Sequence, residues 1–504
     1  MTATLETEPV VVDRIRGIRT NRFFAPALVG VLGLAISLAG IGEASIWYDE
    51  SATIISATRS WEQLGAMIAN VDLVHALYYA VMHVVFDVFG YSPLSLRVPS
   101  AIAIGVAAAL TVVLGRILDS PRLGVLAGVV FCLLPRVTWA GTEGRSYATS
   151  AALAVLLTIV LVLASRSTGN RWWALYAALV VVSCLVFVYL ALVVMAHAVT
   201  MAWWVASDRS RAWPPVARWA RWTALGTAII VPFGVAVMGQ SGQVQWINPP
   251  GKNTFREVFE NQWFYTSTAY AIVAWMLLAA GAFLLLRSGR GLSLASVLLP
   301  ALVVPTVVLL LVSATSTPVF SPRYLMMSTP FVALLMAVTI ERMRPRGLAS
   351  VVLLVLAALV VPQFVAQRQP EAKEKTSWIA IADLIASQRA LDGPDSTTAI
   401  VYGNLQRHPT ATSRVIAYSY PDAFAGTIDV TLGTPAAQTG QLWETRIPLT
   451  EGLPRLADAD VVYLITSESR DARPETTDTL RAAGWNVAEE WGIPLINVVR
   501  YERG

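Results

Sequence analysis

Long uncharged apolar runs constrain this chain more than any other feature of its sequence. Examples lie at 23–42, 98–115, 146–165, 268–286 and 347–367. Each is long enough to cross the hydrocarbon core of a membrane, which needs roughly 20 residues. Only 14% of the residues are charged, whereas about a quarter are charged in an ordinary soluble protein. The chain is therefore a polytopic membrane protein, which excludes a soluble enzyme, a disordered regulator and a nucleic-acid-binding protein.

The charges divide the chain into two parts. Residues 1–366 hold 24 Lys and Arg against 15 Asp and Glu, a net charge of +9, whereas residues 367–504 hold 13 against 18, a net charge of −5. The second part has an ordinary polar composition and is long enough for its own core. We expect a cytoplasmic segment at 1–22, a transmembrane body at 23–366 that includes a first outer loop at 43–97, and an extracytoplasmic α/β domain at 367–504.

Positive charges predict the topology, because basic residues near membrane ends stay on the cytoplasmic side. Of the 24 basic residues in the body, 17 lie in the N-terminal segment and in alternate loops. These loops are 116–122, 166–171, 208–221, 287–290 and 341–346. The stretch 172–207 contains no charged residue and would be about 54 Å long as one helix. Its two flanks are basic and should share a side, so we predict two crossings there.

Residues 73–89 are apolar but short, and they carry His75, His83 and Asp87. Counting them as a crossing would place two basic loops outside. We therefore predict an amphipathic helix at the outer interface. The expected fold class is an all-α polytopic body with 11 crossings and the N-terminus inside, followed by the α/β domain. In that domain, runs rich in Val, Ile and Tyr predict strands at 398–402, 414–419, 461–466 and 496–501, and a helix at 476–483 ends at Gly484.

The first outer loop holds two adjacent carboxylates directly after two aromatic residues. Asp49 and Glu50 follow Trp47 and Tyr48, a few residues after the first span. Partial removal from water raises the basicity of a carboxylate at the membrane surface, which suits a general base. The alternative is an ordinary solvated loop acid.

A second pair in this loop is Asp72 and His75, which share one face if 73–89 is helical. The structural alternatives are a helix-capping Asp72 and an interfacial His75. A metal pair is weakly supported, because no further His or Cys lies at ligand spacing. The two cysteines, Cys132 and Cys184, lie inside apolar runs and are expected in the core. We predict no metal and no cofactor.

Arginines recur near the predicted outer ends of the spans, where a charge without a function is unfavourable. Arg97 opens the second span, Arg136 and Arg145 flank the segment before the fourth, and Arg323 starts the tenth, followed by Tyr324. Each arginine could be an interfacial anchor that extends its charge to the surface. Several together would instead bind a lipid phosphate, because a guanidinium fork matches phosphate oxygens.

The loop at 240–266 is rich in Gln, Asn and Trp and carries Lys252 and Arg256. Aromatic faces with amide groups suit sugars, and the same residue types populate the aromatic belt at membrane interfaces. Both interpretations stay open at this point.

Five motifs occur in one order along the first two thirds of the chain. They are WYDESAT, DLVHALYYAVMHVVFDVFG, SLRVPSAIAIG, EGRSYATSAAL and SPRYLMMSTPFVALLMA. This order resembles the GT-C membrane glycosyltransferases, in the branch of protein O-mannosyltransferases, lipid-A aminoarabinose transferases and similar actinobacterial enzymes. The resemblance covers roughly residues 23–340. Where relatives have a His-Pro-Pro-Leu core, this chain keeps His75 and Leu77 and lacks both prolines.

The resemblance implies transfer of a sugar, most commonly mannose, from a polyprenyl-phosphate donor on the outer face of the cytoplasmic membrane. The acceptor would be a glycolipid, a polysaccharide or a protein. Asp49 would be the general base, with Glu50 as its supporting acid. Arg145 and Arg323 would hold the lipid phosphate, and Asp72 and His75 would order the acceptor or the phosphate.

Other classes of function compete with this interpretation. The nearest alternative enzyme uses polyprenyl-phosphate-arabinofuranose. A transporter or flippase of lipid-linked sugars would also use arginines and an apolar groove, but transporters tend to show internal repeats and interrupted midplane helices. The present sequence shows no repeat, and its acids cluster near one predicted surface. A membrane scaffold whose α/β domain binds a partner is the third class.

Overall fold

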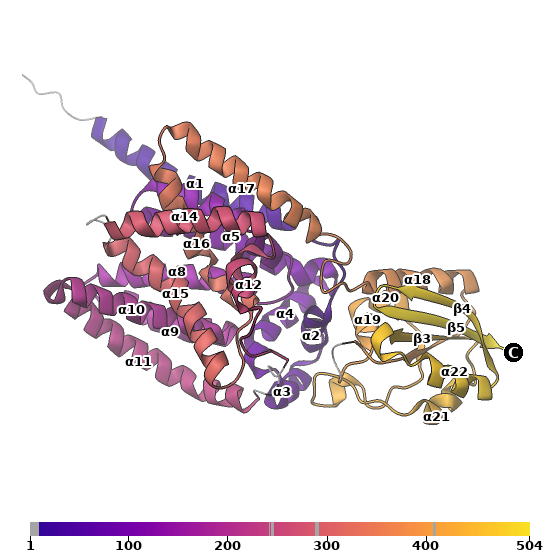
Figure 1. Ribbon diagram of the computed structural model, residues 1–504. Coiled ribbons are helices and arrows are strands. Elements are labelled where there is room, and N and C mark those ends of the chain that lie inside the picture. The colour runs from indigo at the N-terminus through magenta and orange to yellow at the C-terminus, as the bar shows by residue number, and fades with distance from the viewer. Residues whose placement is uncertain (1–9, 241, 243–245, 288–291, 407–409) are drawn as a thin grey trace, which may run out of the picture. The chain divides into compact units, whose positions relative to one another are not determined.

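The computed structural model describes residues 10–240, 242, 246–287, 292–406 and 410–504. It divides into two compact units (Figure 1). The first, the helical unit, comprises residues 10–39 and Arg97–Phe364; the second, the α/β unit, comprises Gly40–Leu96 and Val365–Gly504. The first outer loop, which the sequence analysis assigned to the transmembrane body, therefore packs with the C-terminal domain.

Parts of three predicted segments lie outside the described residues. These parts are residues 1–9 of the N-terminal segment, residues 241 and 243–245 of the loop 240–266, and residues 288–291, which include Arg290 of the predicted inside loop.

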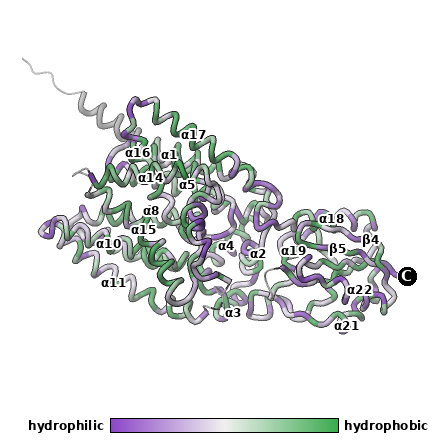
Figure 2. The backbone as a smooth tube through the Cα atoms, viewed as in Figure 1, coloured by the Kyte–Doolittle hydropathy of each residue, from purple (hydrophilic) through white to green (hydrophobic). Residues whose placement is uncertain are grey.

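The helical unit consists of apolar helices joined by short connections. Its elements are α1 (Val10–Leu38), α5 (Pro93–Leu118), α6 (Pro121–Cys132), α7 (Pro135–Ala140), α8 (Tyr147–Ser165), α9 (Arg171–Val186), η2 (Val188–Leu190), α10 (Ala191–Ser207), α11 (Arg209–Gly239), α12 (Thr254–Arg256), η4 (Glu257–Asn261), α13 (Gln262–Phe264), α14 (Thr268–Arg287), α15 (Leu292–Thr315), η5 (Pro322–Ser328), α16 (Thr329–Arg342) and α17 (Arg346–Ala366). Figure 2 shows hydrophobic residues along most of these helices.

Among the described residues, eight helices are long and apolar enough to cross a membrane. Shorter apolar helices occupy Phe23–Leu38, Pro121–Cys132 and Arg171–Val186, at three further predicted crossings. The charge-free stretch 172–207 forms two helices, α9 and α10, separated by η2, as predicted. The total of 11 crossings stays a prediction. Cys132 and Cys184 are buried and free, as expected.

Helices α1 and α5 pack closely because a glycine lies on each. A Cβ atom added to Gly30 would lie 2.9 Å from the carbonyl oxygen of Gly105, and one added to Gly105 would lie 2.8 Å from the carbonyl oxygen of Gly30. Small residues of this kind let two helix backbones approach in a membrane. The contact pairs the two helices between which residues 40–96 are inserted.

The α/β unit combines short helices from both of its chain segments. They are α2 (Tyr48–Ala57), α3 (Trp61–Asn70), η1 (Leu73–His75), α4 (Ala76–Phe89), α18 (Trp378–Asp392), α19 (Arg414–Ser419), α20 (Pro421–Phe424), η6 (Ala436–Gln438), α21 (Leu449–Gly452), η7 (Leu453–Leu456), η8 (Glu468–Arg470) and α22 (Arg473–Ala482). The helix predicted at 73–89 is confirmed by η1 and α4, and the one predicted at 476–483 by α22.

Among the described residues, five strands form one mixed sheet in the order β2-β1-β3-β5-β4. They are β1 (Thr398–Tyr402), β2 (Ile428–Asp429), β3 (Val461–Ser467), β4 (Trp485–Ile493) and β5 (Ile496–Arg503). Strand β1 is parallel to β2 and β3, and β5 is antiparallel to β3 and β4. Strands β1, β3 and β5 confirm three of the four predicted strands.

The fourth predicted strand is wrong, because residues 414–419 form the helix α19. A six-residue apolar run fits a buried strand and a buried helix equally well by its pattern alone. The tertiary structure decides for the helix, because Arg414 at its start binds two acidic side chains from later in the chain, Asp429 and Glu444.

One hydrophobic core joins the first outer loop to the C-terminal domain. Ile46, Met67 and Tyr79 from the loop share it with Ile400 and Tyr463 from the sheet, and all five are fully buried. Residues that share a core lie on the same side of a membrane, so the chain from 97 to 364 must cross an even number of times. The predicted crossings, all but the first of which lie in this stretch, meet that requirement.

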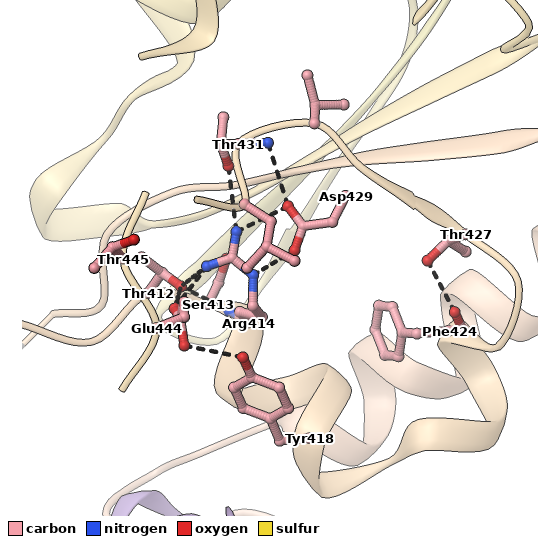
Figure 3. Close-up of polar contacts among 12 residues, drawn as sticks. Thr412, Ser413, Arg414, Tyr418, Phe424, Thr427, Asp429, Thr431, Glu444 and Thr445 are labelled. Carbon is pink, nitrogen blue, oxygen red and sulfur yellow. Dashed lines mark hydrogen bonds and ion pairs between the residues drawn. The ribbon is translucent and has the colours of Figure 1, made fainter. Parts of the chain in front are cut away.

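A buried charge cluster holds α19 to the sheet (Figure 3). Arg414 pairs with Asp429 and, at 2.6 Å, with Glu444. Tyr418 donates a hydrogen bond of 3.0 Å to Glu444. Burial alone would lower the pKa of Arg414, but the two carboxylates outweigh it and hold that pKa above its usual value. The cluster therefore locks three chain segments together.

Replacing Arg414 by Met should lower the free energy of unfolding by about 3–5 kcal/mol, because the buried carboxylate of Glu444 and the partly buried one of Asp429 lose their cation. Arg473→Met is the matched control. Its side chain is 36% exposed and pairs with Asp471 and Glu490, so the loss should stay below about 1 kcal/mol. Thermal unfolding of the full-length protein in nanodiscs measures both, and equal losses would contradict a stabilising role for the cluster.

Candidate functional site

The two predicted catalytic carboxylates begin α2 in the α/β unit. Asp49 and Glu50 lie in its first turn, where the helix dipole stabilises negative charge. Asp49 is half-buried and reaches the surface, whereas Glu50 is fully buried. Only Asp49 is therefore available to accept a proton from a substrate.

Glu50 forms a buried ion pair with a residue from the far end of the chain. The Nζ atom of Lys373, between α17 and α18, lies 2.7 Å from Oε1 of Glu50. Both side chains are almost completely removed from water, so each charge depends on the other. Lys373 was not among the site residues predicted from the sequence, although it is one of only three lysines in the chain.

Tyr79 brings together the second predicted pair, Asp72 and His75. Its hydroxyl donates a hydrogen bond of 2.8 Å to Oδ2 of Asp72, and its ring centroid lies 5.7 Å from that of His75. Asp72 has a left-handed backbone, with φ of 59°, and makes no side-chain capping hydrogen bond. The capping alternative is therefore wrong, and Asp72 lies outside the helix, with Tyr79 near both side chains.

In the helical unit, Arg136 lies between two aromatic rings. Its guanidinium carbon is 4.8 Å from the ring centroid of Trp139 and 4.8 Å from that of Tyr265. The Nε atom donates a hydrogen bond of 3.1 Å to the carbonyl oxygen of Asn261, at the end of η4. The loop 240–266 thus contributes directly to this site through Tyr265.

A chain of rings connects Arg136 with Arg323. Tyr147, the first residue of α8, lies 5.5 Å from Trp139 and 6.5 Å from Tyr324 between ring centroids. Arg323, in η5, places its guanidinium 6.0 Å from the ring of Tyr324 and 4.8 Å from that of Trp246. We call this set the arginine–aromatic cluster: Arg136, Trp139, Tyr147, Trp246, Tyr265, Arg323 and Tyr324.

The electrostatics of the arginine–aromatic cluster favour an anion. Burial lowers the pKa of Arg136 to about 10; Tyr265 and Glu143 oppose this shift, and the charge of Arg323 adds to it. Two guanidinium groups thus repel one another in surroundings of low dielectric constant. An anion with several oxygens, such as a phosphate, would relieve that repulsion and accept their hydrogen bonds.

Arg145 lies in the turn between α7 and α8 and is buried. The hydroxyl of Ser100 donates to the carbonyl oxygens of Glu143 and Arg145, at 2.6 and 3.3 Å. In the same turn, a Cβ atom added to Gly141 would lie 2.7 Å from Cβ of Ser37. The turn therefore packs against the end of α1 and the start of α5, where the chain leaves the helical unit and returns to it.

The remaining predicted residues have varied environments. Arg97 is fully buried at the start of α5. Lys252 is exposed, and Arg256 is largely exposed and pairs with Glu260 at 3.0 Å. These two charges thus face solvent, unlike the buried Arg136.

No sequence motif pointed to Tyr265. Arg136 was recognised as one of the arginines near the outer membrane ends, but it was not among the predicted substrate-binding residues. Tyr265 and Thr266 both have left-handed backbones, with φ of 46° and 64°. Backbone strain in non-glycine residues tends to gather at functional sites, but no sequence pattern reveals it for a tyrosine. The sequence feature that pointed to Arg136 was its position near the predicted outer end of a membrane span.

No protein-family model matches the sequence, and no curated protein matches it either. Solved structures, in contrast, are similar to this chain. The chain is similar to ArnT from Cupriavidus metallidurans bound to undecaprenyl phosphate, with 13% identity, a TM-score of 0.60, and coverage of 94% of this chain and 97% of that one. The apo structure of ArnT gives 12% identity and a TM-score of 0.61, with the same coverage.

A weaker match is the arabinofuranosyltransferase AftD from Mycobacteria, with 17% identity, a TM-score of 0.49, and coverage of 95% of this chain and 41% of that one. The ArnT match extends well beyond residues 23–340, because it covers 94% of the chain, and so it reaches into the C-terminal domain. The chain therefore shares the fold of ArnT, in agreement with the GT-C-like fold expected from the sequence.

Proposed function

We propose that this protein is a membrane glycosyltransferase that moves a sugar from a polyprenyl-phosphate donor to an acceptor hydroxyl, with inversion at the anomeric carbon. The acceptor is a glycolipid, a polysaccharide or a protein, and the reaction takes place on the outer face of the cytoplasmic membrane. The GT-C fold supports this class of reaction.

The arginine–aromatic cluster is the observation that carries the proposal. Arg136 and Arg323 bring two positive charges together among aromatic rings, which suits a phosphate attached to an apolar chain. ArnT, whose fold the chain shares, was solved with undecaprenyl phosphate bound. We assign the donor phosphate to Arg145 and Arg323, as the resemblance implies, and add Tyr324 and Arg136.

In the proposed mechanism, Asp49 accepts the proton of the acceptor hydroxyl. The acceptor oxygen forms a bond to the anomeric carbon as the bond from that carbon to the phosphate oxygen breaks. The polyprenyl phosphate leaves with the bonding electron pair, and the arginines stabilise its charge. Attack opposite the leaving phosphate inverts the anomeric centre. Asp72 and His75 order the acceptor, while Lys252 and Arg256 contact the sugar from the loop 240–266.

Mannose is the sugar we propose, because polyprenyl-phosphate-mannose is the common donor implied by the sequence resemblance. Arabinofuranose on the same lipid is the alternative donor.

The α/β unit lies on the outer side of the membrane in this proposal. Support comes from the core that residues 40–96 share with residues 365–504. Because α1 carries basic residues before its apolar stretch, its far end and the first outer loop should lie outside.

Asp49→Asn should lower turnover by about 10²–10⁴-fold, the range for loss of a general base, and leave folding and donor binding intact. The measurement is transfer of radiolabel from polyprenyl-phosphate-mannose, or from the arabinofuranose donor, to a membrane glycolipid extract in nanodiscs. Asp87→Asn is the control, because Asp87 lies in the same loop, is 64% exposed and pairs with His83. Turnover like wild type in Asp49→Asn would remove Asp49 from the mechanism.

Arg323→Ala should raise the apparent KM for the lipid donor by about tenfold or more, since a charged hydrogen bond is worth about 1.5–3 kcal/mol. Donor titration in the same assay measures this change. Arg344→Ala, at an exposed arginine in a predicted inside loop, should leave the donor KM unchanged. An unaltered donor KM in Arg323→Ala would exclude its phosphate role.

Glu50 acts in this proposal by positioning Asp49 through its pair with Lys373. Lys373→Met should destabilise the fold by about 3–5 kcal/mol, because it removes the cation that lies 2.7 Å from a buried carboxylate. The double variant Glu50→Gln/Lys373→Met should recover most of that loss, whereas Lys375→Met, at an exposed neighbour, should lose little. Melting temperatures measure stability, and the pH profile of turnover tests positioning. A double variant as unstable as Lys373→Met would contradict the pairing.

A further inference from the structure

A pocket in the α/β unit is lined by the residue that precedes the proposed base. Its volume is about 480 Å³ when the open solvent at its mouth is included. Tyr48, which directly precedes Asp49, lines one side, and Gln406, Ser467 and Leu495 line others. The helix α2 that carries Asp49 begins at Tyr48 itself, so a ligand that touches the Tyr48 ring lies beside the first turn of that helix.

The topology of the sheet independently predicts a binding site at this position. From β1 the chain continues to β2 on one side of β1, and then to β3 on the other side, with both neighbours parallel to β1. The connection that follows β1 runs to one side of the sheet, and the connection that follows β3 runs to the other. Where the connections of two neighbouring parallel strands diverge in this way, a crevice opens at their carboxyl ends, and ligands of α/β sheets bind there. Gln406 follows β1, and Ser467 ends β3, so the pocket occupies this crevice.

Hydrogen bonds from the C-terminal domain hold the pocket walls in place. Trp443 donates a bond of 3.0 Å from Nε1 to the hydroxyl of Tyr48, and its ring centroid lies 5.2 Å from that of Tyr48. The hydroxyl of Thr376 donates to the carbonyl oxygen of Ile46 at 3.3 Å, and that of Ser377 donates to the carbonyl oxygen of Pro494 at 2.8 Å. The ring of Tyr48 is therefore preorganised.

The backbone of the walls is strained as well. The lining residues Glu374 and Leu495 have φ angles of 53° and 69°, and Lys375, the neighbour of Glu374, has a φ of 60°. All three lie in the left-handed region that non-glycine residues seldom adopt. They are three of the six such non-glycine residues in the part of the chain that the structure describes. Strain of this kind persists where the surroundings enforce it, and it gathers at binding sites.

The lining chemistry fits a saccharide. The partly exposed aromatic ring of Tyr48 offers an apolar surface to the C–H face of a sugar ring, while the carboxylate of Glu374 and the amide of Gln406 can bond its hydroxyl groups. A peptide acceptor would favour an open strand edge for main-chain pairing. The open edges of this sheet are β2 and β4, whereas the two strands at the pocket, β1 and β3, are paired on both sides. The pocket lies at the strand ends instead.

Building on the proposed function, we propose that this pocket is the acceptor subsite: it binds the saccharide end of the acceptor and presents a hydroxyl group to Asp49. The C-terminal domain is then part of the catalytic apparatus, because it builds the acceptor site with Tyr48. The acceptor is a glycan, free or lipid-linked, and not a polypeptide.

Gln406→Trp tests this subsite, because Gln406 is exposed at the pocket and a large side chain there fills it. Full-length protein in nanodiscs receives a radiolabelled polyprenyl-phosphate sugar and increasing amounts of membrane glycolipid extract. We expect the apparent KM for the extract to rise by about tenfold or more, with the donor KM and the turnover at saturation nearly unchanged, since binding alone is lost. Gln441→Trp, at an exposed glutamine of the same unit, is the matched control and should behave like wild type.

A smaller change guards against misfolding of the tryptophan variant. Gln406→Ala removes only the amide and should raise the acceptor KM by about fivefold, as expected for one lost hydrogen bond. An unchanged acceptor KM in a folded Gln406 variant overturns the subsite while wild-type transfer still stands. Label recovered in a proteinase-sensitive product overturns the saccharide assignment. A wild-type protein that transfers no label from either donor instead refutes the proposed function itself.

Discussion

A buried carboxylate needs a cation, and that requirement organises the α/β unit. Glu50 and Lys373 lie 323 positions apart in the chain, yet each is the buried partner of the other. The pair fastens the segment after α1 to the segment after α17, and the core around Tyr79 and Tyr463 completes the junction. Because the two segments fold as one body, Asp49 sits on a rigid support and not on a free loop.

Buried charges also constrain the helical unit, where they lie among aromatic rings. Arg136 and Arg323 come from different helices and are connected by a chain of aromatic rings. Repulsion between them is acceptable only where another interaction compensates for it, and an anionic ligand would supply one. A carboxylate that reaches the surface and cations that gather among apolar groups are the two elements that transfer from a lipid phosphate requires.

The sequence was most informative where a pattern repeats along the chain. Apolar runs of spanning length and alternating basic loops predicted helices that the structure contains, including the break between α9 and α10. Strands β1, β3 and β5 were recognisable from their Val and Ile content. Residues 414–419 have the same composition but form a helix, because Arg414 is bound by side chains that are distant in the sequence. Short apolar runs carry too little periodicity to separate these outcomes.

By itself, the sequence determined that the chain is a membrane protein and that it divides into an apolar basic part and a polar acidic part. It also supplied the candidate residues Asp49, Asp72, His75 and Arg323. Hydropathy, charge and local motifs are properties of neighbouring residues, and so a sequence reveals them directly. Only the tertiary structure decided that the first outer loop belongs with the C-terminal domain, that Glu50 is bound to Lys373, and that Tyr265 joins Arg136. Each of these pairings closes a long loop in the chain, and its partner is selected by burial and shape in the folded core, which no local pattern encodes.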